Sequence, residues 1–194
     1  MKDCMIDLET MGVGSNPALL QISAVPFNIN TCEYDADGAF NTHIDLNSCF
    51  DHGLTVSAGT IRFWMTNPQV TQEAREMVMS QTGEHTGGGT GLVPALVAFN
   101  KWYAERGMRF VHGNGAASDN VWLRSAFDAC GIAPLFNFRN DMCFRTIKKM
   151  AERSGWRNNY TRVGVYHNGV DDAVSQILTL KSVLEHLGLL GRLS

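Results

Sequence analysis

Alternating apolar and polar positions near the amino terminus predict a first β-strand over residues 4–9. Side chains two residues apart point to the same face of a strand, so Asp7 and Glu9 share a face. Two further apolar runs, 19–27 and 39–44, lie on either side of a polar turn region. This spacing predicts a meander of antiparallel strands.

Helical patterns follow these strands. Asn67 and Pro68 are typical of a helix N-cap with proline at the first helical position, and they predict a helix that continues to residue 78. Glycine-rich residues 80–91 predict a flexible loop, because the GKS or GKT ending of a phosphate-binding loop is missing. The rest of the pattern predicts a strand over 109–112 and helices over 93–106, 120–130, 146–153 and 170–187.

This order of elements indicates the fold class. Strands come first and are then mixed with helices, which is typical of a mixed α/β sheet. The chain has 194 residues, of which 44% are hydrophobic, enough for a sizeable core. No internal repeat or linker interrupts it, so we expect one domain over residues 1–194.

Charge and cysteine usage narrow the class of protein further. Sixteen Lys and Arg residues against nineteen Asp and Glu residues give a net charge of −3, which taken alone argues against a general affinity for nucleic acid. The five cysteines are widely spaced without a CxxC pair, and are expected to be free thiols in a reducing compartment. The first ten residues carry acids where a signal peptide needs an apolar segment. The longest apolar stretch, 18–27, is interrupted by Gln21 and Ser23 and is too short to span a membrane. We therefore expect a cytoplasmic protein without a membrane partner.

Several acids lie where an apolar element meets a polar or glycine-rich turn. Asp7 and Glu9 fit either a metal-binding pair on a buried face or the solvent face of an edge strand. Asp119 precedes a predicted helix, where an N-cap is the simpler interpretation. His167 and Asp172 bracket the start of the last helix, where acids also complement the helix dipole. Asp141 fits a salt-bridged strand.

The order of these residues along the chain resembles that of the DEDDh 3′–5′ exonucleases. The matching residues are Asp7 and Glu9 in DLETMG, Asp119 in GNGAASDNVWL, and His167 with Asp172 in HNGVDDA. The family places its last acid five residues after the histidine, which selects Asp172 over its neighbour. TIRFW and RNDMCFRT look most like the phage DexA-like and mycobacterial RNase AS-like group within this superfamily.

This resemblance implies a ribonuclease-H-like fold, a mixed five-stranded sheet flanked by helices. It also implies a 3′–5′ exonuclease that releases nucleoside 5′-monophosphates from single-stranded ends by a two-metal mechanism. On the family pattern two Mg²⁺ or Mn²⁺ ions would be held, the first by Asp7, Glu9 and Asp172 and the second by Asp7 and Asp119. His167 would act as the general base.

The resemblance also suggests where the substrate binds. Thr10, Met11 and Gly12 occupy the place that holds the terminal nucleotide in the superfamily. Trp64 fits equally a base-stacking residue and a core tryptophan. Arg145 belongs to residues 137–163, where seven basic residues against two acidic ones give a local charge of +5, and the rest of the chain carries −8. This asymmetry is what a track for a polyanion requires.

Two other functions remain open from the sequence. One is a catalytically silent nucleic-acid-binding module on the same fold, and the other is a metal-dependent phosphatase acting on small phosphate esters. The sequence does not decide between DNA and RNA, because no motif reports contact with a 2′-hydroxyl. Relatives that dimerise suggest a homodimer.

Overall fold

A five-stranded mixed sheet forms the centre of the molecule. The computed structural model describes residues 1–80 and 88–193, and the strand order within them is β3-β2-β1-β4-β5. Antiparallel pairing joins the first three strands into the expected meander, and β4 and then β5 add in parallel to β1. The bounds are β1 (Asp3–Thr10), β2 (Leu19–Phe27), β3 (Phe40–His43), β4 (Phe110–Gly113) and β5 (Asp141–Cys143). The mixed α/β sheet is confirmed.

Strand β1 is central, so the edge-strand interpretation of Asp7 and Glu9 is wrong. Its two faces are covered by different apolar clusters: Met5 packs with α7 residues on one face, and Ile6 packs with residues of α4 and α5 on the other. Because side chains alternate along a strand, Asp7 and Glu9 share the face of Met5. The two acids therefore lie on the covered face of the innermost strand.

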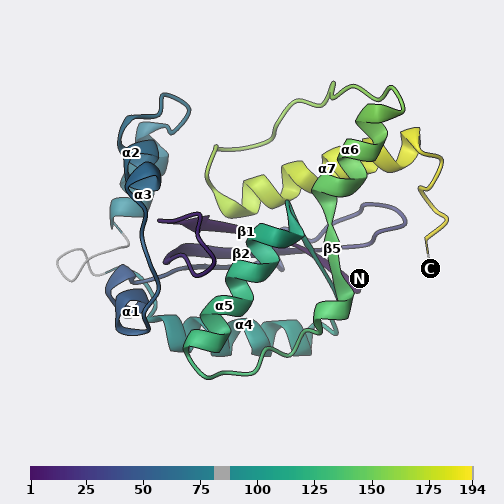
Figure 1. Ribbon diagram of the computed structural model, residues 1–194. Coiled ribbons are helices and arrows are strands. Elements are labelled where there is room, and N and C mark those ends of the chain that lie inside the picture. Colours follow the sequence, from purple (N-terminus) through teal and green to yellow (C-terminus); the bar gives the residue numbers. More distant parts are fainter. Residues whose placement is uncertain (81–87, 194) are drawn as a thin grey trace.

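Helices cover both faces of the sheet (Figure 1). Helices α4 and α5 pack on one face, and α6 and α7 pack on the other, while α1, α2 and α3 gather near the end of the sheet where β1 finishes. Their bounds are α1 (Leu46–Asp51), α2 (Ala58–Thr66), α3 (Gln72–Ser80), α4 (Leu92–Glu105), α5 (Val121–Ala129), α6 (Phe144–Arg153) and α7 (Gly169–His186). None of the helices described is both long and apolar enough to cross a membrane.

The segment around Asn67 differs from the prediction. Helix α2 begins after Ser57, whose side chain accepts the Thr60 N–H, and it ends at Asn67, which is therefore a C-cap and not an N-cap. The Asn67 side chain instead closes a turn by accepting the N–H of Gln69 at 2.8 Å. Thr71 then accepts the N–H of Ala74 at 3.1 Å at the start of α3. Most of the predicted glycine-rich loop, residues 81–87, lies outside the described part of the chain.

The approach to α5 is also irregular. A short π-helix, η1 (Ala116–Asn120), connects β4 to α5, so Asp119 lies inside a helical turn and does not cap one. Gly115 enters this turn with φ of +128°, a conformation that side-chain-bearing residues rarely adopt. π-Helical turns are frequent at functional sites. Before β5, a 3₁₀ turn, η2 (Phe138–Asn140), leads to Asp141. This acid forms an ion pair with Arg124 at 2.7 Å, as expected for a salt-bridged strand.

Candidate active site

Three segments bring carboxylates to the end of β1. Asp7 and Glu9 come from β1 itself, and Glu9 is 8% exposed. Asp119 comes from η1, more than a hundred residues later, and its Oδ1 accepts the backbone N–H of Leu8 at 3.4 Å. The irregular turn before α5 therefore directs its acid onto the strand that carries the other two.

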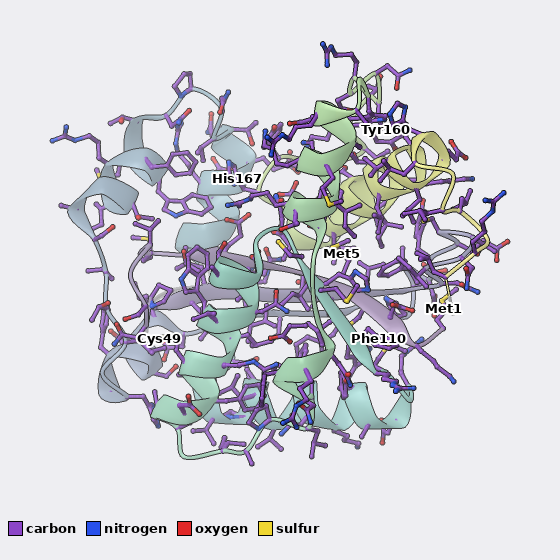
Figure 2. The ribbon with its side chains drawn as sticks, turned by 45° about the vertical axis from the view of Figure 1, so that its right-hand side comes forward. Met1, Met5, Cys49, Phe110, Tyr160 and His167 are labelled. Carbon is purple, nitrogen blue, oxygen red and sulfur yellow. The ribbon has the colours of Figure 1, made fainter. Side chains whose placement is uncertain are left out.

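The fourth acid and the histidine come from the start of α7. Asp172 lies in the first turn and is 8% exposed. Its Oδ2 accepts the backbone N–H of His167 at 3.1 Å. The imidazole Nδ1 of His167 lies 3.4 Å from Oε1 of Glu9. Figure 2 shows His167 between the α2–α3 end of the molecule and the α6–α7 layer. The five residues taken from the family pattern thus lie in one place.

Polar residues of β2 and β3 hold the start of α7 on the sheet. Gln21 lies opposite Glu9 across the β1–β2 pair, and its Oε1 accepts the N–H of Gly169, the first residue of α7, at 3.1 Å. Gln21 Nε2 in turn donates to Asn41 on β3 at 2.9 Å. A Cβ at Gly169 would come within 2.8 Å of the Ser23 Cβ, so the close approach of helix and sheet requires glycine there.

His167 is held by strain and by aromatic contacts. Its φ of +65° places it in the left-handed region, which few non-glycine residues adopt and which is typical of functional positions. Its ring packs edge-on against Phe63 and Trp64 of α2, with ring centroids 5.4 and 5.2 Å away, and is tilted against Tyr166 at 5.5 Å. Backbone and ring are both fixed, so the imidazole is oriented before any substrate arrives.

The negative charges of the acids repel one another. Burial, followed by the neighbouring charges of Glu9 and Asp119, raises the pKa of Asp7 well above its ordinary value. Burial also raises the pKa of Asp119, to about 6, against hydrogen bonds that lower it. A cluster of acids whose ionised forms are disfavoured is stabilised by bound cations.

The donor set fits divalent cations. Glu9, His167 and Asp172 each offer one ligand atom, and these atoms lie within 4.8 Å of one another. Carboxylate oxygens are the ligands that Mg²⁺ and Mn²⁺ prefer. Asp7 and Asp119 add two more carboxylates beside this group. Among the residues the structure describes, the end of β1 is therefore the position suited to a metal.

A polar cavity of about 400 Å³ opens over the acids. Its lining includes Asp7, Glu9, Lys148, Tyr160 and Arg162, and so combines the acids of the sheet with bases from α6 and from the segment that follows it. The cavity therefore offers a phosphate both cation-binding groups and side-chain cations.

A second, largely apolar cavity of about 370 Å³ adjoins the first. Leu8, Val13, Phe63 and Trp64 line it, and Glu9 belongs to both cavities. An apolar slot beside a polar phosphate-sized cavity suits a nucleobase next to its phosphate.

Of the remaining residues expected to bind substrate, Thr10 and Trp64 line the apolar cavity, whereas Met11, Gly12 and Arg145 line neither cavity. Thr10 lines the apolar cavity, and its hydroxyl donates to the carbonyl of Gly12 at 2.7 Å. Met11 packs between two apolar clusters. Trp64 is 6% exposed and its Nε1–H donates to the carbonyl of Thr10 at 2.9 Å. Arg145 donates to the carbonyl of Asn114, which lines the polar cavity.

Two site residues were missed from the sequence although a signal was present. Gln176 donates to Asp7 Oδ1 at 2.7 Å, and its position one helical turn after Asp172 places it on the same face of α7. Gln21 was noticed only as an interruption of an apolar run. A polar residue inside a buried strand requires a partner, and that partner is the backbone of α7.

Known proteins show the same fold. The crystal structure of cell-death related nuclease 4 (CRN-4) matches with a TM-score of 0.61 at 15% identity, over 96% of this chain and 64% of that one. This chain therefore spans less than two thirds of the length of CRN-4. The nuclease domain of 3′hExo, a DEDDh family member bound to rAMP, matches with a TM-score of 0.59 at 14% identity, over 97% and 93%. Both likenesses show the ribonuclease-H-like fold expected of DEDDh nucleases.

Sequence comparison adds the family. No curated protein sequence matches the chain. The family profile described as the 3′-5′ exoribonuclease Rv2179c-like domain, however, matches residues 2–184 and so covers all the residues of the site. A match of this extent shows that the chain belongs to the Rv2179c-like family of 3′–5′ exoribonuclease domains.

Proposed function

We propose that this chain hydrolyses single-stranded RNA from its 3′ end and releases nucleoside 5′-monophosphates. The observation that carries the proposal is the convergence of Asp7, Glu9, Asp119 and Asp172 with His167 at the end of β1. Four carboxylates with a histidine, beside a polar and an apolar cavity, suit phosphodiester hydrolysis at a chain end.

The four acids would hold two Mg²⁺ or Mn²⁺ ions. Glu9 and Asp172 share one ligand group, Asp119 lies against the backbone of Leu8, and Asp7 is close enough to Glu9 and Asp119 for their charges to raise its pKa. When bound, the ions would activate water, neutralise charge on the phosphate and stabilise the departing 3′ oxygen. The protein contributes the fixed positions of the acids, which Gln176, Gln21 and the Leu8 backbone orient.

His167 would take the proton of the attacking water. Its Nδ1 faces Glu9, which favours a proton on that nitrogen and leaves Nε2 to act as the base. The aromatic contacts of Phe63, Trp64 and Tyr166 limit rotation of the ring. Together these contacts support a general base aligned in advance.

The terminal nucleotide would lie across the two cavities. Its base would enter the apolar cavity beside Trp64, and Thr10, Met11 and Gly12 would support its sugar from the end of β1. Arg145 and Lys148 would contact the preceding phosphates along the basic segment. The description of the family as exoribonucleases supports RNA as the substrate.

We also propose a cytoplasmic location and a homodimer. The five cysteines form no disulfide, in keeping with a reducing compartment such as the cytoplasm. The homodimer suggested by the family resemblance can be measured by light scattering of the purified chain.

A substrate panel tests the proposal. Purified protein with Mg²⁺ or Mn²⁺ would be given matched single-stranded RNA, single-stranded DNA, duplexes, adenylate tails and a nitrophenyl ester of thymidine monophosphate. We expect shortening of single-stranded RNA from the 3′ end, with turnover per site far above that on the ester. Binding of RNA without cleavage would instead support a silent binding module. Equal turnover on the ester and on RNA would support a phosphatase.

A further inference from the structure

Arg162 reaches into the acid cluster from outside the family pattern. Arg162 belongs to residues 154–168, the segment without helix or strand that joins α6 to α7 over the site (Figure 1). Its guanidinium forms an ion pair with Oδ1 of Asp172. Arg162 also lines the cavity that contains Asp7, Glu9 and His167. In Figure 2, Tyr160 from the same segment and His167 both lie above the sheet.

The guanidinium makes further contacts in the same position as this ion pair. Its centre lies 3.6 Å from the centroid of the Tyr166 ring, and its Nη2 donates to the carbonyl of Val165 at 3.1 Å. Its buried Nε has no hydrogen-bond partner among the described residues, so one edge of the fork is not used. Neither the ring nor the carbonyl belongs to Asp172, so both contacts can hold Arg162 at the cavity wall when that carboxylate is occupied.

Arg162 and a divalent cation compete for one carboxylate. A metal ion binds a carboxylate oxygen at about 2.1 Å and excludes a guanidinium from that oxygen. The two positive groups would also repel each other in a partly buried site. The side chains of Arg162 and Asp172 are 26% and 10% exposed, so solvent screens this repulsion only in part.

Once displaced, Arg162 would lie beside the substrate. The polar cavity accommodates a phosphate group, and the planar fork of a guanidinium matches phosphate oxygens with two parallel hydrogen bonds. The Tyr166 ring and the Val165 carbonyl hold the side chain at the cavity wall. The free Nε–H then becomes part of the fork that a phosphate can use.

We propose that Arg162 is a resident counter-ion that occupies Asp172 until a divalent cation takes the carboxylate, and that it then binds the phosphate of the terminal nucleotide. This inference rests on the proposed function, since it assumes that metal and nucleotide bind here. It assigns opposite effects to one side chain: Arg162 weakens metal binding in the free protein and strengthens nucleotide binding in the loaded one.

Arg162→Gln tests both effects by binding alone. Calorimetric titration with Mn²⁺ in the absence of nucleotide should show at least threefold tighter binding by Arg162→Gln than by the wild type. Titration with adenosine 5′-monophosphate in saturating Ca²⁺ should show at least tenfold weaker binding. Arg162→Lys, which keeps the charge but loses the fork, should bind Mn²⁺ like the wild type and the nucleotide more weakly.

Arg109→Gln is the matched control. Arg109 also lies over an aromatic ring, that of Phe110, and its N–H donates to the carbonyl of Lys2, just before β1. Figure 2 shows Phe110 well away from His167. Its substitution should change neither binding constant. An Arg162→Gln protein that binds Mn²⁺ no more tightly than wild type, or the nucleotide equally well, overturns the inference.

A measurement on the wild-type protein covers the case in which Arg162→Gln does not fold. The Nε–H resonance of Arg162 should shift when Mg²⁺ is added without nucleotide and shift again with the nucleotide, and an unchanged resonance overturns the inference. A wild type that binds no Mn²⁺ refutes the proposed function itself. Normal Mn²⁺ binding by the wild type with no change in Arg162→Gln refutes only the inference.

Discussion

The side-chain amide of Gln176 donates to Oδ1 of Asp7 at 2.7 Å and joins residues 169 positions apart in the chain. Gln176 follows Asp172 by one turn of α7, so this helix carries one acid of the site and orients another. The hydrogen bond also lowers the pKa of Asp7, against the larger effects of burial and neighbouring charge. The first turns of α7 thus supply Asp172 and also hold Asp7 in position.

Gln176→Leu should weaken metal binding without unfolding the protein. Loss of a hydrogen bond that orients a metal ligand typically costs about 10- to 100-fold in metal affinity or activity. The Mn²⁺ concentration for half-maximal activity should therefore rise by about tenfold or more. Gln72→Leu is the control, because Gln72 is exposed on α3 and its amide donates to Glu76. Equal metal requirements in the two variants would show that Gln176 does not position Asp7.

Trp64→Phe should alter catalysis more than stability. It removes the hydrogen bond to the Thr10 carbonyl, worth about 1 kcal/mol, and loosens the edge-on contact with His167. Trp102→Phe removes an equivalent bond to the Gly38 carbonyl on the far side of the sheet. Denaturant unfolding should show similar losses in both variants, whereas steady-state kinetics should show lower kcat/KM only in Trp64→Phe. Equal kcat/KM values would assign Trp64 to the core alone.

Asp119→Asn should stabilise the metal-free protein at pH 7.5. Burial raises the pKa of Asp119 to about 6, so the folded state holds this proton more tightly than the unfolded state does. Folding is therefore favoured at low pH and loses stability as pH rises from about 4 through about 6. Asparagine keeps the oxygen that accepts the Leu8 N–H but removes the charge.

The size of this effect follows from the pKa difference. A shift of about two units corresponds to roughly 2–3 kcal/mol, and we expect a gain of that order in the free energy of unfolding with EDTA present. Asp128→Asn, an exposed acid of α5, should change it by less than about 0.5 kcal/mol. With Mg²⁺ present the gain from Asp119→Asn should disappear. A loss of stability in EDTA would contradict the charge argument.

The variant His167→Asn distinguishes two roles of this histidine, general base and metal ligand. Asparagine tolerates the left-handed backbone of this position, so the N–H to Asp172 should be kept. If His167 is the base, the rate should fall about 10²- to 10⁴-fold and the acidic limb of the pH–rate profile should change, while Mn²⁺ affinity stays within a few fold. A parallel loss of Mn²⁺ affinity would instead make His167 a ligand beside Glu9 and Asp172.

Much of the framework was predictable because it depends on local patterns. Residues 19–27 form β2 at the predicted bounds, and α7 begins and ends within one residue of its prediction. Helix α2 was missed because it depends on the Ser57 cap at its start and on the burial of Trp64. Neither the packing of Trp64 nor the Asn67 turn that ends the helix can be predicted from the local composition.

The residues of the candidate site also divide into those that the sequence predicts and those that only the structure reveals. The four acids and His167 were predictable from their order along the chain, which the family resemblance interpreted. Gln21 depends on the pairing of β2 with β1 and on the docking of α7, and Arg162 depends on the path of a segment without regular structure. Contacts of this kind arise only when distant segments meet, so they required the structure.

Directional release of nucleotides tests the central claim most directly. Single-stranded RNA would be incubated with Mn²⁺ and the wild type, Asp7→Ala, or the wild type with EDTA, and the products identified by mass. We predict nucleoside 5′-monophosphates released one at a time from the 3′ end by the wild type alone, with Asp7→Ala folded but inactive. Cleavage inside the chain, release from the 5′ end, or undiminished cleavage by Asp7→Ala or in EDTA would contradict the account.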